Sequence, residues 1–240
     1  MGLDMLKPLD GWRQFFGEVG IIVLGVVIAL GLEQAILQWN WSNKVERSRQ
    51  TLREELMTDY LLAEERVAAK PCLMAQLDSL ENAVLKARGE MTPVPLIVEP
   101  DFVFAYRAPW QPWHDTAWKG IEADEMLSHF PRTERENYAS VHAEIDMLSK
   151  LNEDESTEQA KLLGLTKPLD IDPMTKNHYV ELIESEREKA ELMAVLSRSV
   201  MKQAETIGAV PSASRRREFL NRESTTLAYC RRHNLPLATP

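Results

Sequence analysis

A cluster of aromatic and polar residues between positions 107 and 118 offers the chemistry of a ligand-binding site. Three tryptophans share this short segment with an arginine and a histidine, and a few polar groups among aromatic rings suit a small-molecule pocket. The candidate ligand-binding residues are Arg107, Trp110, Trp113, His114 and Trp118. The function that these residue types predict is recognition of a small molecule, without a reaction.

The same segment has a second interpretation, in which the tryptophans fill one end of a helical bundle. Five prolines lie between positions 91 and 113, so this stretch is predicted to be a long ordered connection. His114 and Asp115 are neighbours in sequence, which is typical of a helix cap more than of a catalytic pair. Asp115 or Thr116 is expected to open a short helix that ends near Phe130. We favour this packed interpretation.

The chain contains no catalytic or cofactor-binding motif. The P-loop, the dinucleotide-binding glycine pattern, HExxH and GxSxG are all absent. None of the five histidines follows a glutamate by three positions, so the helical di-iron pattern fails. His142 and Asp146 have the spacing of an ordinary surface pair on a helix. We therefore expect no enzyme activity, no cofactor and no metal site.

Two cysteines, Cys72 and Cys230, are a candidate disulfide pair. A bond between them would close a loop of about 158 residues, for which loop entropy predicts on the order of 4–5 kcal/mol of stabilisation. Two unrelated buried thiols are an equally good interpretation of the spacing alone. There is no CxxC pair, so neither a zinc ribbon nor a thioredoxin-like redox site is indicated.

An apolar segment from Phe15 to Leu37 is the strongest signal in the chain. Its uncharged core, Val19 to Leu32, has 14 residues and would be only about 21 Å long as a helix. The whole segment has 23 residues, or about 34 Å, which is long enough to cross a bilayer. Tryptophans flank it, with Trp12 before it and Trp39 and Trp41 after it, as in interfacial aromatic belts.

The predicted organisation is an N-terminal tail (1–14), a transmembrane anchor (15–39) and a helical extramembrane domain (40–240). Two alternatives to an uncleaved anchor stay open. The segment could be the core helix of a soluble protein, since runs of 10–14 apolar residues usually are. It could also be an export signal cleaved near Ala29-Leu30-Gly31, although the stretch before it is long and only weakly basic.

The orientation of the anchor is not fixed by the sequence. Two basic residues, Lys7 and Arg13, precede the span, whereas four follow it within about 16 residues. This count favours a cytoplasmic large domain. The four residues alternate with glutamates, and a disulfide would persist only in an oxidising compartment such as the periplasm. We expect the large domain in the periplasm, with the chain in the bacterial inner membrane.

The remaining sequence predicts an all-α fold, an N-terminal transmembrane helix that continues into a stalk and an antiparallel helical bundle. Pro71 is expected to begin a new helix that ends before Gly89. A short extended piece could lie within residues 96–106. The predicted later features are a capping box at Thr133 and Glu136, a solvent-exposed polar run at 152–159, a helix from Pro173 to about Gly208, and a last helix from Ser212 to about Arg232.

Charge is unevenly distributed along the chain. The 28 basic and 37 acidic residues give a net charge of −9, whereas the part from Arg198 onward carries about +5. A basic end could meet an anionic lipid surface or an acidic partner, but a solvated helix face is the simpler interpretation of Arg215 to Arg217. The overall negative charge and the lack of a recognition motif argue against nucleic-acid binding.

Several segments resemble an uncharacterised family of small single-span bacterial membrane proteins. The resemblance is carried by the stretch GEVGIIVLGVVIAL from Gly17 to Leu30 and by the following Trp39-Asn40-Trp41. Pro71-Cys72, the Pro-Trp-x-Pro-Trp segment and Cys230 near the end are similar to alphaproteobacterial members. The resemblance implies a single-span envelope protein and favours a Cys72–Cys230 bridge. It implies no activity.

The function predicted from these observations is that of a membrane-anchored interaction or scaffold protein of the cell envelope. The expected partners are the lipid bilayer and a protein, including a second copy of the chain. Gly25 and Ala29, four positions apart on the anchor, would allow close packing of two spans. The alternative is a small-molecule sensor that uses the Trp110–Trp118 cluster.

Overall fold

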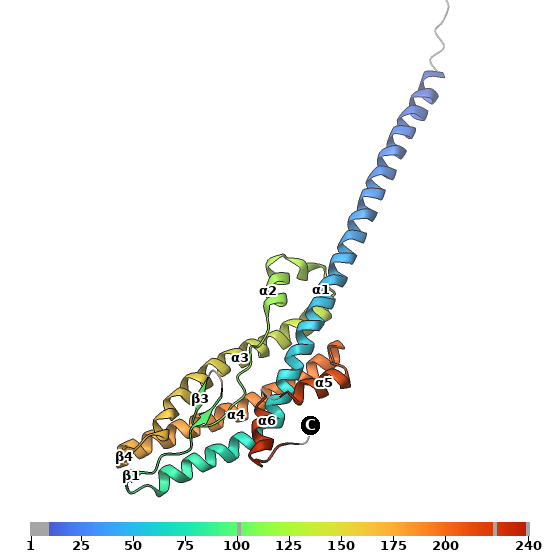
Figure 1. Ribbon diagram of the computed structural model, residues 1–240. Helices are drawn as coiled ribbons and strands as arrows, with labels where there is room; N and C mark the ends of the chain where they lie inside the picture. Colours follow the sequence, from blue (N-terminus) through green and yellow to red (C-terminus); the bar gives the residue numbers. More distant parts are fainter. Residues whose placement is uncertain (1–9, 100–101, 223–224, 239–240) are drawn as a thin grey trace, which may run out of the picture. The chain divides into compact units, whose positions relative to one another are not determined.

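The computed structural model describes residues 10–99, 102–222 and 225–238. These residues form six α-helices, two short 3₁₀ helices and two small two-stranded sheets, which confirms the predicted all-α class (Figure 1). The chain divides into two compact units. The first unit ends at Arg49 and the second begins at Gln50.

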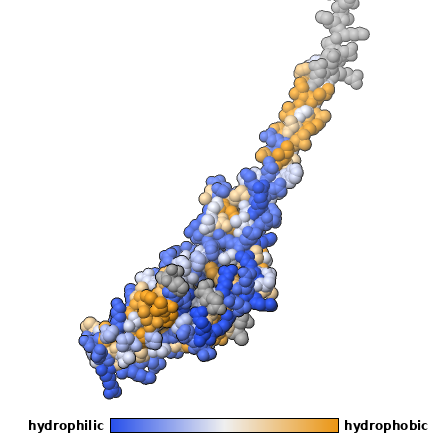
Figure 2. Space-filling view, viewed as in Figure 1, coloured by the Kyte–Doolittle hydropathy of each residue, from blue (hydrophilic) through white to orange (hydrophobic). Residues whose placement is uncertain are grey.

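The helical part of the first unit belongs to α1 (Asp10–Lys86). Residues 1–9 of the predicted tail lie outside the described part of the chain, and the rest of that tail is helical. An 18-residue window of α1 has a mean hydropathy of 2.4, and none of it is buried. Ile21, Ile22, Val23 and Leu24 are each more than half exposed. Because successive helical residues point about 100° apart, these four apolar side chains are spread around the helix, and on the face that Figure 2 shows, this part of α1 is largely apolar.

α1 continues through Pro71, so the predicted start of a new helix at that residue is wrong. Proline removes one helical hydrogen bond and usually bends the helix. Figure 1 shows α1 changing direction in this region. Ala69, Cys72 and Leu73 on either side of Pro71 are fully buried, and their packing holds the helix together across the missing bond. α1 ends before Gly89, as predicted, and Gly89 has a φ of +79°.

The second half of α1 packs with α3 (Arg132–Leu162) and α4 (Pro173–Ile207) into a bundle. Bonds from Tyr60 to Glu205 and from Lys70 to Glu191 show that α1 and α4 are antiparallel. Apolar residues from these helices meet in the core cluster of the second unit. Its members include Leu73, Leu77, Leu80, Val84, Leu162, Leu165, Leu182 and Ile183.

The predicted limits of α4 are confirmed. The Asp172 side chain accepts a hydrogen bond from the main-chain N–H of Thr175 at 2.6 Å, and Pro173 occupies the first turn. Gly208 ends the helix with a φ of +78°, in the left-handed region that glycine adopts without strain. Both end signals are local in sequence, which is why the pattern revealed them.

Two other predicted helix features are wrong. α3 begins after Pro131, where no side-chain cap bond is formed, so Thr133 lies inside the first turn and Glu136 pairs with Arg132 instead. The single last helix is in fact two, α5 (Ala213–Leu220) and α6 (Thr226–Arg232). α6 has a cap of its own, because the Thr225 side chain accepts a bond from the N–H of Ala228.

Short elements occupy the connections between the long helices. The predicted extended piece is a hairpin of β2 (Ile97–Val98) and β3 (Val103–Phe104). β1 (Gly89–Met91) pairs with β4 (Leu169–Ile171), and both strands lie where no strand was predicted. The predicted helix ending near Phe130 is α2 (Thr116–Ala123) followed by a 3₁₀ turn, η1 (Met126–His129). A second such turn, η2 (Leu163–Thr166), follows α3.

Candidate functional site

The proline-rich connection runs antiparallel along α1 and is bonded to it at successive turns of the helix. We call residues 105–118 the clamped loop. Its contacts with α1 run in strict reverse order of sequence. They join Gln76 to Arg107, Arg66 to Pro109, Leu62 and Glu65 to Gln111, Asp59 to His114, and Glu55 to Ala117 and Trp118. The polar face of α1 therefore serves to hold this loop.

At one end of the clamped loop, a carboxylate of α1 caps α2. Glu55 accepts hydrogen bonds from the main-chain N–H groups of Ala117 at 2.8 Å and Trp118 at 3.4 Å. Asp115, which was expected to be a capping residue, occupies the cap position but forms no side-chain cap bond. The cap comes from a residue 62 positions before Ala117, which no local pattern could reveal.

Asp59 and His114 form the next contact. One carboxylate oxygen of Asp59 lies 3.0 Å from the main-chain N of His114 and 3.1 Å from its Nδ1. Burial raises the pKa of Asp59 to about 6, while the hydrogen bond to Asp59 raises the pKa of His114. His114 therefore pairs with α1 and not with its sequence neighbour Asp115.

The three tryptophans of the predicted ligand-binding set do not share one environment. Trp110 is 65% exposed, and Trp113 is buried. Trp118 stacks on the ring of His142, with ring centroids 4.9 Å apart and planes 11° from parallel. His142 is buried, which lowers its pKa to about 4, and it does not form the predicted surface pair with Asp146, which bonds Lys150.

Two cavities of the second unit lie away from this set. The larger, about 530 Å³, is a groove between α1, the segment before β2 and the C-terminal segment. Its walls include Ala75, Ser79 and Ala83 of α1 together with Pro93, Pro95 and Tyr229. The smaller, about 160 Å³, lies between β3 and α3. None of the five predicted ligand-binding residues lines either cavity, and Arg107 instead bonds Glu99 and the main chain of the clamped loop.

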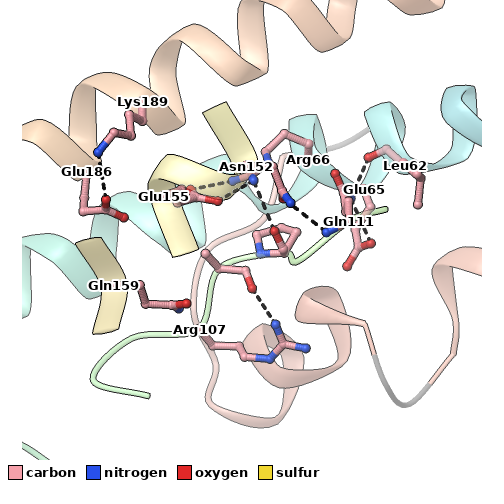
Figure 3. A network of polar contacts seen from close by, with 12 residues as sticks. Leu62, Glu65, Arg66, Arg107, Gln111, Asn152, Glu155, Gln159, Glu186 and Lys189 are labelled. Atoms are coloured by element: carbon pink, nitrogen blue, oxygen red, sulfur yellow. Dashed lines mark hydrogen bonds and ion pairs between the residues drawn. The ribbon is translucent and has the colours of Figure 1, made fainter. Parts of the chain in front are cut away.

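The centre of the clamped loop is fixed by a buried ion pair. Arg66, which is fully buried, donates to both carboxylate oxygens of Glu155 at 2.8 and 2.5 Å, and to the carbonyl oxygen of Pro109 at 3.2 Å (Figure 3). Asn152 and Gln159 flank Glu155 on the same face of α3, and they bond the main chain of Gln111 and Tyr106.

These three α3 residues correct the prediction for residues 152–159. That run was expected to be solvent-exposed, whereas Asn152, Glu155 and Gln159 are buried. Their spacing of three and four places them on one helical face. This spacing is visible in the sequence. A polar helix face can be predicted to be buried, however, only when the groups that it binds are known. Here the partners are Arg66 and the main chain of the clamped loop.

Glu186 of α4 extends the network towards the core. It accepts hydrogen bonds from the Tyr106 hydroxyl and from Lys189, and burial raises its pKa to about 7. Lys189 also pairs with Glu158 of α3. The carboxylates and cations in this part of the molecule thus bind one another and the loop main chain. In the described residues no group of three or more His, Cys, Asp or Glu side chains could hold a metal ion.

The raised pKa of Glu186 predicts a pH-dependent stability. The native state holds this proton up to about pH 7, whereas the unfolded chain loses it near the ordinary value of 4.5, so stability falls as pH rises between these values. Between pH 5 and pH 8, the loss of this proton should lower the free energy of unfolding by about 2 kcal/mol. In urea unfolding, the free energy of unfolding of the Glu186→Gln variant should fall correspondingly less over this pH range. Glu188→Gln, an exposed change on the same helix, should behave like the wild type, and equal pH slopes for all three proteins would refute the assignment.

The two cysteines lie at disulfide distance. Cys72 of α1 and Cys230 of α6 have sulfur atoms 2.01 Å apart and Cα atoms 6.1 Å apart, and both side chains are fully buried. Tyr229 packs beside them and also lines the larger cavity. The pair fixes α6 to the C-terminal part of α1.

The basic C-terminal part is only partly a solvated face. Arg216 binds the buried carboxylate of Glu64, with Nε 3.1 and 2.9 Å from its two oxygens, and Arg215 bonds the Thr58 hydroxyl at 3.1 Å. α5 is therefore held to α1 by charge. Comparisons with protein-family models, with curated proteins and with solved structures gave no match for this chain.

Proposed function

We propose that this chain is a single-span membrane protein whose second unit acts by binding a partner, as an interaction or scaffold protein of the bacterial envelope. The observation that carries the proposal is the apolar part of α1 in the first unit. Large apolar side chains there are exposed on every side of the helix, which costs free energy in water and is favourable in lipid. A helix also satisfies its own main-chain hydrogen bonds within the bilayer.

The buried cysteine pair supports an oxidising location for the second unit. Structural disulfides persist in the periplasm and are rare in the cytosol. The bacterial inner membrane, with the second unit in the periplasm, agrees with the resemblance to single-span envelope proteins. The basic residues that follow the span, such as Lys44 and Arg47, favour the opposite orientation by the positive-inside rule, so topology is the decisive measurement.

A binding role, and not a reaction, fits the way the charged side chains are used. Arg66, Glu155, Glu186 and Lys189 bind one another inside the second unit. Asp59 and Glu55 hold the clamped loop. These contacts make a rigid helical body, which is what an interaction module requires to present a fixed surface.

The orientation is tested by labelling one position on each side of the predicted span. Met174 is 81% exposed at the start of α4, so Met174→Cys should react with a membrane-impermeant maleimide in cells with a permeabilised outer membrane. Leu3→Cys, on the other side of the span, should react only after lysis. The native cysteines should stay unlabelled because they are buried and paired. The reverse pattern would place the second unit in the cytosol, and recovery of the chain in the soluble fraction would refute the anchor.

A further inference from the structure

Among the described residues, β3 is the only strand paired with β2, so one edge of β2 has no neighbouring strand there. Glu99 and Phe102 exchange both main-chain hydrogen bonds, at 2.9 and 3.3 Å. In an antiparallel ladder, bonded and non-bonded pairs alternate, so the next pair, Val98 with Val103, is non-bonded. The N–H and C=O groups of Val98 therefore point away from β3.

The same alternation applies to Leu96, two residues earlier, whose main-chain groups share the outer edge with those of Val98. Within the described residues, neither Leu96 nor Val98 forms a main-chain hydrogen bond with a turn or loop outside the hairpin. An edge of this kind presents a row of donors and acceptors to any other strand that approaches it.

The side chains around this edge are apolar and exposed. Val98 is 70% exposed and Phe102 is 64% exposed, and nearly half of the surface of Leu96 and of Val103 is also open. Figure 2 shows an apolar patch on the second unit, at the place where Figure 1 has β3. A free strand edge and an exposed apolar patch thus coincide on one hairpin.

We propose that β2 is an interaction edge for a second copy of this chain, which adds its own β2 antiparallel. With Ile97 opposite Ile97 of the second copy, each Leu96 faces a Val98. The outward N–H and C=O groups of these residues can then form four main-chain hydrogen bonds. The result is a sheet of four strands in the order β3, β2, β2, β3. Its outer face carries two Leu–Val cross-strand contacts.

A second copy fits this edge because the edge is complementary to itself. A two-fold axis through Ile97 pairs the apolar residues with each other and places Glu99 opposite Pro95, so that no like charges meet across it. Val94, the next residue toward the N-terminus whose groups would point outward, donates its N–H to the carbonyl oxygen of Leu165 at 2.9 Å, so the ladder ends after Leu96.

The strength of this association rests on the proposed function. Three residues on each side cannot bury the roughly 800 Å² per partner of a stable soluble interface. Anchoring in one membrane raises the effective concentration of the copies, as a linker does, so pairing is expected in the bilayer and should be lost on dilution in detergent. The anchor and the edge can be tested separately.

The test uses single added cysteines in the full chain, in isolated membranes. Val98→Cys should give a dimer with a short bismaleimide, several-fold more than Leu192→Cys, an exposed apolar position on α4 (44% exposed, against 70% for Val98). Labelling with a monofunctional maleimide shows that both thiols react equally. The native cysteines do not interfere, because they are paired.

A second substitution distinguishes cross-linking that depends on strand pairing from cross-linking that depends only on an exposed thiol. Leu96→Pro in the Val98→Cys chain removes an outward N–H but none of the β2–β3 bonds, so it should cut cross-linking several-fold at an unchanged Tm. Equal cross-linking at Val98 and Leu192, or full cross-linking in the Leu96→Pro chain, would overturn the inference. Failure of the anchor would instead appear as recovery of the chain in the soluble fraction, so the anchor and the edge are judged by different measurements.

Discussion

Replacing both Cys72 and Cys230 by alanine is expected to lower the free energy of unfolding of the second unit by about 3–5 kcal/mol. The bond closes a loop of 158 residues, and loop entropy alone gives the upper end of that range. Because domain stabilities are about 5–15 kcal/mol, the loss would be a large share of the total. Denaturant unfolding of the wild type and the double variant in detergent measures it directly.

The local effect should be concentrated at the C-terminal segment. Apart from the cysteine pair, the main-chain contacts of this segment with α1 include Thr226 N to Glu65 at 2.9 Å and Ala238 N to the carbonyl oxygen of Ala68 at 3.0 Å. Amide exchange in α6 should therefore accelerate more than in α4. A reductant should destabilise the wild type once denaturant exposes the bond, and should leave the alanine variant unchanged. Coincident unfolding curves for the two proteins would contradict a stabilising bond.

What the sequence could predict depends on how local the determining contact is. α4 was predicted at both ends because Asp172, Pro173 and Gly208 act within a few residues of the helix termini. The exposed apolar part of α1 was likewise visible, since a long apolar stretch needs no partner to be recognised. These features are decided by short stretches of sequence.

The failures share a dependence on distant partners. Pro71 usually marks a helix boundary, but the buried neighbours Cys72 and Leu73 keep α1 continuous. The polar run around Glu155 was expected to face water because its partner, Arg66, lies 89 residues earlier in the chain. α6 was merged with α5 although Thr225 caps it locally; the other group that holds its first turn, Glu65, lies in α1.

The candidate site was the least predictable part. Sequence proximity suggested that the three tryptophans and His114 form one pocket, yet α1 binds the loop in an extended path that separates them. The spacing of the cysteines was equally compatible with a disulfide and with two free thiols. The tertiary structure distinguishes the two, because it places α6 against α1. The free edge of β2 depends on hydrogen-bond alternation, which no composition reveals.

Substituting Arg66 by methionine is expected to destabilise the second unit by about 3–5 kcal/mol, the usual cost of leaving one buried charge without its partner. Arg66 is fully buried and its two bonds to Glu155 are charge-assisted, while a third bond holds the carbonyl oxygen of Pro109. The methionine side chain would fill most of the volume but satisfy neither group. The clamped loop should loosen, which the fluorescence of its tryptophans would report.

The two partners of this pair should not be equivalent. Glu65 and Glu155 both raise the pKa of Arg66, and Glu155 also raises the pKa of Glu186, so Arg66 is a cation among several carboxylates. Removing it leaves their mutual repulsion uncompensated, whereas Glu155→Gln removes one carboxylate and keeps an acceptor for the guanidinium. Arg66→Met should therefore cost more than Glu155→Gln. The exposed change Arg132→Met, which breaks a surface pair with Glu136, should cost less than about 1 kcal/mol.

Replacing both partners by apolar residues tests whether the pair stabilises the fold or mainly specifies it. In Arg66→Met with Glu155→Leu, neither residue leaves a buried charge, and such exchanges are often close to neutral. The double variant should regain much of the stability that the Arg66→Met variant loses, with a coupling energy of about 2 kcal/mol or more in the mutant cycle. Its clamped loop should nevertheless stay looser, because the bond to Pro109 is not restored. Additive losses in the cycle would mean that the two side chains act independently, and would remove the ion pair as the element that fixes the loop to α1.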